Sequence, residues 1–355
     1  MKKSFLQEIV LLRAFTIVTI VTIHFFDLTL FSKNVLDNTE ISFNLQILFT
    51  RACILFTRGN SSIFVFISGF LFYHVFYKKG FNYKQFFLSK LKNCFIPYLI
   101  TVLFFCIIQG FITPVILKSF NFRFPDFISF FQQTFYYGAL WYIPFIMLVF
   151  FLSPMFITFI ETNKKTQILF LTIFSLVSFF VGRGINYNPA RSLIYFCSFY
   201  LWGIYISINY DYFLSLRKIF WLGIGILFSV LTIFMLSRNY LSEQRYIVSY
   251  GYISKLLYTL LLLRFFNLYT QKTSFGNTLY FHIANYSFSL YFAHNYFLYA
   301  YDITAKWLKI FTPIRLREQF LYTVVLVTVT CLITLTIAPI LKKFFGKYSK
   351  MIIGA

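Results

Sequence analysis

The sequence predicts an all-α integral membrane protein that crosses the bilayer about ten times. Hydrophobic residues make up 59% and charged residues only 12% of the 355 residues, whereas soluble domains are about 45–50% apolar and about 25% charged. Apolar stretches long enough to cross a hydrocarbon layer of about 30 Å recur along the whole chain, and short polar segments separate them. We therefore expect one membrane domain over residues 1–355 and no soluble domain.

The net charge of +22 does not indicate a nucleic-acid partner. The basic residues are scattered through short loops between apolar spans, whereas a nucleic-acid-binding protein gathers them on one domain or face. The five cysteines have no paired spacing, and most lie in or beside apolar spans, as small buried hydrophobic residues do. We expect neither a disulfide framework nor a metal site from them. They are Cys53, Cys94, Cys106, Cys197 and Cys331.

The first apolar span, residues 9–31, carries Arg13 and His24 inside a helix of membrane length. An arginine at the centre of such a helix costs about 2.5–3.5 kcal/mol on insertion scales. At about 100° per residue the two side chains share one face, and they stand about 16 Å apart along the axis. Alone, Arg13 could extend to the inner surface and His24 could line a helix contact. Their alignment favours a functional polar stripe.

Two further spans and a basic segment follow. The second span, residues 61–77, contains FVFISGF, in which Ser68 and Gly69 would let another helix approach closely. Residues 78–93 combine lysines with apolar side chains, which predicts an amphipathic helix lying in the inner membrane interface. The third span is expected at residues 95–117.

The remaining seven spans are again separated by short polar loops. The ninth span of the chain holds the motif SFSLYFAH, with Tyr291 and His294, and the tenth ends in the basic tail KKFFGKYSK. We expect the fourth span at residues 140–160 and the fifth to end at 182. The others are expected at residues 192–208, 219–236, 250–268, 281–301 and 320–341.

Lysine and arginine divide unevenly between alternate loops. With the N-terminus inside, lysines predominate in the inner segments and arginines in the outer ones. A lysine-rich inner side follows the positive-inside rule, so we expect both termini in the cytoplasm and the chain in the inner (cytoplasmic) membrane. The start MKKSF leads into the first span without a small-residue cleavage site, so we expect a retained first helix.

Several motifs on these spans resemble those of the acyltransferase 3 family. They follow the order of that family over nearly the whole chain, and the lysine-rich step before IPY is similar to the branch of the polysaccharide intercellular adhesin succinyltransferase. The motifs are Arg13-x10-His24, FVFISGF, IPY at 96–98, LWYIP at 140–144, FYLWGIYI with Gly203, and SFSLYFAH ending at His294.

The resemblance implies a membrane-bound O-acyltransferase. Members of the family move acyl groups from cytoplasmic acyl-CoA to sugars or lipids, many of them on the cell surface. We accordingly expect acyl-CoA as a co-substrate, no other cofactor, and an acetyl or succinyl group as the one transferred. The acceptor would be a hydroxyl of a surface polysaccharide or a lipid-linked sugar, and a homodimer is compatible with this activity.

Acyl transfer to a hydroxyl needs a base for the proton and a group that stabilises the developing oxyanion. His24 is the best candidate for the base, because an imidazole titrates near neutral pH without further help. Asp27, three residues later, could orient the ring of His24 or face water at the helix end. His294, together with Tyr291, could hold the acceptor or a neighbouring helix.

The donor side is expected around Arg13, which would bind the phosphates or the thioester end of acyl-CoA and could pair with Glu8. Many family members carry an Arg-x-x-Arg pair before the third span that is implicated in donor binding, whereas this chain has Lys90 and Lys92 there. Lysine meets phosphate as a point charge but lacks the planar fork of arginine. We assign donor binding to Lys90, Lys92 and Ser68.

A polysaccharide exporter or flippase is the main alternative from another functional class. Ten helices with a polar stripe in their interior would also serve that activity. Such transporters are commonly built from inverted repeats, with interrupted helices at corresponding positions of the two halves. No internal symmetry of this kind is evident in the sequence.

Overall fold

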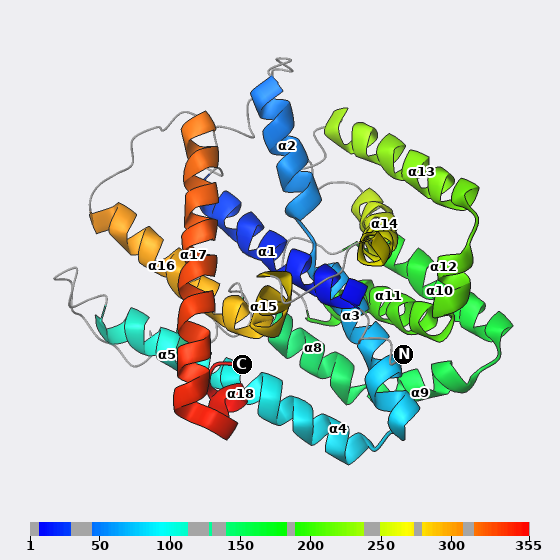
Figure 1. The fold of residues 1–355 in the computed structure, drawn as a ribbon, viewed down its shortest axis with the longest axis horizontal. Coiled ribbons are helices and arrows are strands. Elements are labelled where there is room, and N and C mark those ends of the chain that lie inside the picture. Colours follow the sequence, from blue (N-terminus) through cyan, green and yellow to red (C-terminus); the bar gives the residue numbers. More distant parts are fainter. Residues whose placement is uncertain are drawn as a thin grey trace. The chain divides into compact units, whose positions relative to one another are not determined.

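The computed structural model describes residues 7–29, 45–112, 128–129, 140–182, 189–237, 249–272, 279–307 and 316–354. All regular structure in these residues is helical, which confirms the predicted all-α class (Figure 1). The α-helices are α1 (Gln7–Thr29), α2 (Leu45–Thr57), α3 (Ser61–Leu71), α4 (Tyr83–Lys90), α5 (Ile96–Ile107), α8 (Tyr142–Phe151), α9 (Ser153–Glu161), α10 (Lys164–Val181), α11 (Pro189–Ile208), α12 (Tyr210–Ser215), α13 (Lys218–Ser237), α14 (Tyr250–Lys272), α15 (Leu279–Asn285), α16 (Ser287–Trp307), α17 (Leu316–Phe345) and α18 (Ser349–Ile352). The π-helical turns η1 (Phe72–Phe76), η3 (Leu91–Phe95) and η4 (Ile108–Ile112), and the tighter turns η2 (Tyr77–Lys79) and η5 (Gly346–Tyr348), extend them.

Helices lie at all ten places where the sequence predicts spans. Within the described residues, seven helical stretches are long and apolar enough to cross a membrane, and α8 with α9, bent by 55° at their junction, would make an eighth. The other two places are held by α14 and α16, which have 23 and 21 residues but more polar sequences. A multi-pass membrane protein is therefore confirmed, while the number ten stays a prediction. The part of the third span beyond residue 112 and the start MKKSF lie outside the described residues.

The basic segment before the third span differs from its prediction. It does not form a separate interfacial helix: α4 passes through the π-helical turn η3 directly into α5, so that residues 83–110 form one long helical stretch. Pro97 does not break this stretch because it stands in the first turn of α5, where a proline removes no needed N–H bond. Lys84, Lys90 and Lys92 are thus part of the helical stretch that contains the third span, while Lys78 and Lys79 lie in η2.

The chain divides into two compact units. The first unit comprises Met1–Ile20, Ile41–Phe87 and Leu148–Ala284, and the second comprises Val21–Glu40, Leu88–Met147 and Asn285–Ala355. Helix α1 contributes its first part to the first unit and its last part to the second.

The first unit is centred on a close crossing of α3 and α11. A Cβ atom added to Gly69 would lie 2.1 Å from the carbonyl oxygen of Tyr200, and one added to Gly203 would lie 2.1 Å from that of Phe66. The two backbones are therefore in direct contact, as the small residue in FVFISGF predicts. Apolar side chains of α1, α3, α11, α12 and α14 pack around this crossing: Ile9, Leu12, Ile63, Phe66, Ile67, Phe70, Ile206, Phe213, Leu260 and Leu263.

Side-chain hydrogen bonds join the other helices of the first unit. Ser178 on α10 donates to Ser198 on α11 at 2.9 Å, and Ser175 on α10 accepts from Trp202 at 3.0 Å and from Tyr252 at 3.0 Å. Such bonds hold helices together where lipid tails remove the hydrophobic driving force between them. The apolar outer faces of α10 and α13 are largely exposed, as expected for helices that face lipid.

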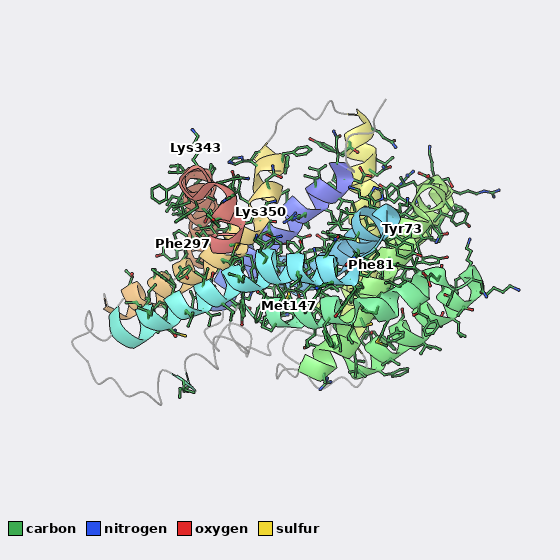
Figure 2. The ribbon with its side chains drawn as sticks, turned by 90° about the horizontal axis from the view of Figure 1, so that it is seen from below. Tyr73, Phe81, Met147, Phe297, Lys343 and Lys350 are labelled. Carbon is green, nitrogen blue, oxygen red and sulfur yellow. The ribbon has the colours of Figure 1, made fainter. Side chains whose placement is uncertain are left out.

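The second unit packs α5 and α17 against α16. Tyr296 on α16 donates to the carbonyl of Thr101 on α5 at 3.0 Å, and the rings of Tyr301 and Tyr322 join α16 to α17. The C-terminal helix α18 packs against α5 and η3, and Ser289 donates to the carbonyl of Ile353 at 2.8 Å. The basic tail is thus folded back onto this unit. Figure 2 labels two of its lysines, Lys343 on α17 and Lys350 on α18.

Candidate functional site

Two histidines lie side by side in the second unit. The ring centroids of His24 on α1 and His294 on α16 are 5.3 Å apart, and the ring planes are tilted by 33°. His294 is fully buried, whereas His24 is half-buried. The two histidine motifs that the sequence shows 270 residues apart therefore meet at one place.

His294 has an unusual environment for a buried polar side chain. The carbonyls of Leu290 and Tyr291 lie near its ring, one turn earlier on α16. Neither ring nitrogen, however, meets hydrogen-bond geometry with any residue that the structure describes. Nearly all buried polar atoms in proteins have a partner, so a group without one calls for an explanation.

Aromatic side chains from two other motifs surround the histidine pair. The ring of Tyr291 lies 5.6 Å from His294 and 6.1 Å from Tyr142, the central residue of LWYIP. Tyr98 of the IPY motif and Cys94 lie within electrostatic range of Tyr291. Four motifs of the sequence therefore converge in the second unit. The only sequence signal for Tyr142 is its place inside the LWYIP motif.

Asp27 lies on α1 three residues after His24 and is exposed. This spacing places the two side chains on the same side of the helix, one above the other. The position is compatible with both expectations, an orienting partner of the His24 ring and a carboxylate facing water. The orienting role stays a prediction.

Arg13 and Ser68 belong to the first unit. Arg13 is half-buried on α1. The helix is unbroken between Arg13 and His24, as the prediction of a shared helix face requires. The Ser68 hydroxyl donates to the carbonyl of Phe64 within α3 at 2.9 Å, beside the contact made by Gly69. A role of either residue in donor binding stays a prediction.

Glu8, which could pair with Arg13 on the sequence alone, has a hydrogen-bond partner on another helix. It is buried near the start of α1, and its carboxylate accepts a hydrogen bond from the hydroxyl of Tyr210 on α12. Burial, together with the charge of Glu8, raises the pKa of the Tyr210 phenol well above its ordinary value. This bond joins the first turn of α1 to α12.

Lys90 and Lys92 lie in the second unit, at the step from α4 to α5. Lys90 ends α4, and Lys92 is exposed on η3. Short π-helical turns of this kind interrupt α-helices and occur often at functional sites. Helix α18 packs against η3 and carries the exposed Lys350, so a third cation stands on the neighbouring element. The basic tail can be recognised in the sequence, but its packing against η3 cannot.

The described part of the chain contains no group of three or more His, Cys, Asp or Glu residues that could hold a metal ion. The candidate site thus comprises the histidine pair with Tyr291 and Tyr142, and the lysine-rich step that precedes α5, all in the second unit.

Comparison with known proteins supports the motifs on which the resemblance depends. The model of the acyltransferase 3 family, described as an acyltransferase domain, matches residues 6–342. No curated protein and no solved structure matches the chain. The match covers nearly the whole sequence and includes every residue of the histidine pair, the aromatic motifs and the lysine-rich step.

Proposed function

The chain belongs to the acyltransferase 3 family and is a multi-pass membrane acyltransferase, and on this premise we propose a specific reaction. An acetyl or succinyl group passes from cytoplasmic acyl-CoA to a hydroxyl of a cell-surface polysaccharide or glycolipid, forming an ester. Family membership also favours an enzyme over the exporter or flippase that the helix count alone would allow.

The observation that carries this proposal is the contact between His24 and His294. In the proposed step, the oxygen of the acceptor hydroxyl attacks the thioester carbon while His24 accepts the proton of that hydroxyl. The new C–O bond forms, the C–S bond breaks, and the proton passes to the departing thiolate to give free coenzyme A. His294, whose ring nitrogens have no described partner, is suited to hydrogen-bond the acceptor beside His24.

The donor is proposed to enter from the cytoplasmic side past the lysine-rich step. Acyl-CoA is rich in phosphate, and Lys90 and Lys92 are cations built onto a spanning helix. Arg13 lies on the same helix as His24 and would bind the phosphates or the thioester end.

The proposed topology has both termini and the lysine-rich loops in the cytoplasm. It rests on the predominance of lysine in the inner segments and on the basic tail. Reporter proteins fused after Lys92 and after Lys165 are expected to give cytoplasmic signals. An extracytoplasmic signal at either fusion would reverse this assignment.

The test of the proposed reaction compares cells that have and lack the protein. Mass spectrometry of their surface glycans and glycolipids should detect an ester-linked acyl group only when the protein is present. Membranes given acyl-CoA with an isotopically labelled acyl group should place the label in the same product. Equal acylation with and without the protein contradicts the proposal, and loss of the glycan from the surface with its acyl groups retained supports the exporter.

Changing both Lys90 and Lys92 to Gln should raise the KM for the acyl-CoA donor and leave the amount of folded protein unchanged. The reason is that two cations that face the donor phosphates are lost while both side chains keep nearly the same length. Lys164 and Lys165 at the start of α10 are exposed cations of the first unit, and their change to Gln is the matched control. An unchanged donor KM in the Lys90, Lys92 variant would locate the donor site elsewhere.

A further inference from the structure

A buried lysine outside the candidate site joins three segments of the first unit. Lys255 lies on α14, and only 8% of its surface is exposed. Its ammonium donates to the carbonyl oxygens of Leu55 and Phe56 at 2.9 and 3.0 Å, and to Oδ1 of Asn60 at 2.9 Å. An ammonium has three N–H donors, so all three are used.

The two carbonyls belong to the last turn of α2. A helix leaves its last carbonyls without intrahelical donors and carries a partial negative charge at that end. The chain here turns through Gly59, whose φ is 79°, before α3 begins. The ammonium of Lys255 therefore caps α2 from a position 200 residues later in the sequence. This accounts for a buried charged residue inside α14.

Asn60 connects the Lys255 cap to α1 through a hydrogen bond. It is fully buried, and its Nδ2 donates to Oγ1 of Thr19 at 2.8 Å. The Thr19 hydroxyl in turn donates to the carbonyl of Thr16 within α1 at 2.9 Å. Because Lys255 occupies the oxygen of the Asn60 amide, the NH2 group of that amide is left to face α1. The direction of the bond to Thr19 is thereby fixed.

We propose that Lys255 and Asn60 are positioning residues that set the rotation of α1, and with it the direction of His24 and Arg13. The proposal rests on the function proposed for His24. In a membrane, a helix packed among others of similar apolarity has several comparable rotations, and interhelical hydrogen bonds select among them. Thr19 stands between Arg13 and His24 on α1. A hydrogen bond that fixes the rotation of the helix at Thr19 therefore fixes the directions of both side chains.

The test removes the tie to α1 without disturbing the cap of α2. Thr19→Val deletes the acceptor and keeps the side-chain shape, while Lys255 retains all three of its oxygen partners. We expect kcat for acyl transfer to fall about tenfold, because a misplacement of about 1 Å costs up to about 10²-fold. The donor KM and the yield of folded protein should be unchanged. Thr19→Ser keeps the hydroxyl and should restore kcat.

The matched control is Thr16→Val, one turn earlier on the same helix. Thr16 is buried whereas Thr19 is half-buried, and the Thr16 hydroxyl donates to the carbonyl of Leu12 in its own helix at 2.6 Å. The Thr16→Val variant should keep the wild-type kcat. An undiminished kcat in Thr19→Val, or an equal loss in Thr16→Val, would overturn the proposal.

A second measurement does not depend on activity. Diethyl pyrocarbonate acylates accessible histidines, and mass spectrometry of the peptide that contains His24 gives its rate of modification. If α1 turns, this rate should differ at least about twofold between wild type and Thr19→Val and return in Thr19→Ser. Equal rates in all three overturn the proposal. If the wild type transfers no acyl group, the proposed function fails, while the modification rates still decide whether Thr19 positions α1.

Discussion

His24→Ala is expected to abolish detectable acyl transfer while the protein still inserts and accumulates normally. Loss of a general base costs roughly 10²–10⁴-fold in rate, and alanine makes a membrane-spanning helix more apolar. His24 is half-buried and lies against the fully buried His294. The alanine variant therefore lacks the more exposed imidazole of the pair. The measurement is label transfer from acyl-CoA to the glycan, together with the amount of protein in the membrane.

Two controls separate this result from a general loss of structure. His24→Gln keeps a polar side chain of similar size but loses the titrating proton, and it should be as inactive as alanine. His282 is an exposed histidine on α15, and His282→Ala should keep full activity. Acylation retained in His24→Ala would exclude His24 as the base. Loss of glycan export with acylation of the retained polymer intact would support a transporter instead.

The two histidines of the candidate site could be identified from the sequence because each lies in a motif inside an expected span. A histidine inside a membrane helix is costly and therefore conspicuous, and both His24 and His294 stand out in this way. Their contact was not predictable from spacing, because helical geometry relates residues only within one helix. The resemblance to a family identified both motifs, and the structure brings the two rings together.

Helix positions were predicted well where hydropathy is high and less well where polar residues interrupt it. The expected eighth span agrees with α14, whereas the expected ninth, residues 281–301, begins in α15 and ends within α16. Neither α14 nor α16 is apolar enough to be recognised as a span by hydropathy alone. Lys255 lowers the apolarity of α14, and its three oxygen partners show how that helix accommodates it. Those partners come from a segment about 200 residues away, which no local pattern reveals.

The boundary before the third span was wrong for a related reason. Lysines among apolar residues are typical of an interfacial helix, and the same composition also suits the inner end of a spanning helix whose lysines extend to the surface. In the structure α4 continues through η3 into α5, so the segment is not a separate helix. Helix α18, near the end of the chain, packs against η3 and α5, and no local sequence pattern reveals this contact.

Gly69→Ala and Gly203→Ala are each expected to prevent the first unit from forming its native core. In each variant the new methyl group would stand 2.1 Å from a backbone carbonyl oxygen of the facing helix. A flexible side chain could move aside, but here the obstacle is main chain, so α3 and α11 must separate. The cost should exceed the about 1–3 kcal/mol of ordinary overpacking, because the apolar cluster around the crossing opens as well. The measurements are the yield of monodisperse protein in detergent and its apparent Tm.

Gly223 and Gly225 on α13 provide the matched control for this last prediction. A Cβ atom at either position would meet nothing within 4 Å, so alanine adds no clash there. Alanine also favours the helix over glycine by about 0.5–1 kcal/mol. Gly223→Ala and Gly225→Ala should therefore keep the wild-type yield and apparent Tm or raise them slightly. A wild-type Tm in Gly203→Ala would show that α3 and α11 are not in backbone contact, and the close crossing at the centre of the first unit would then be wrong.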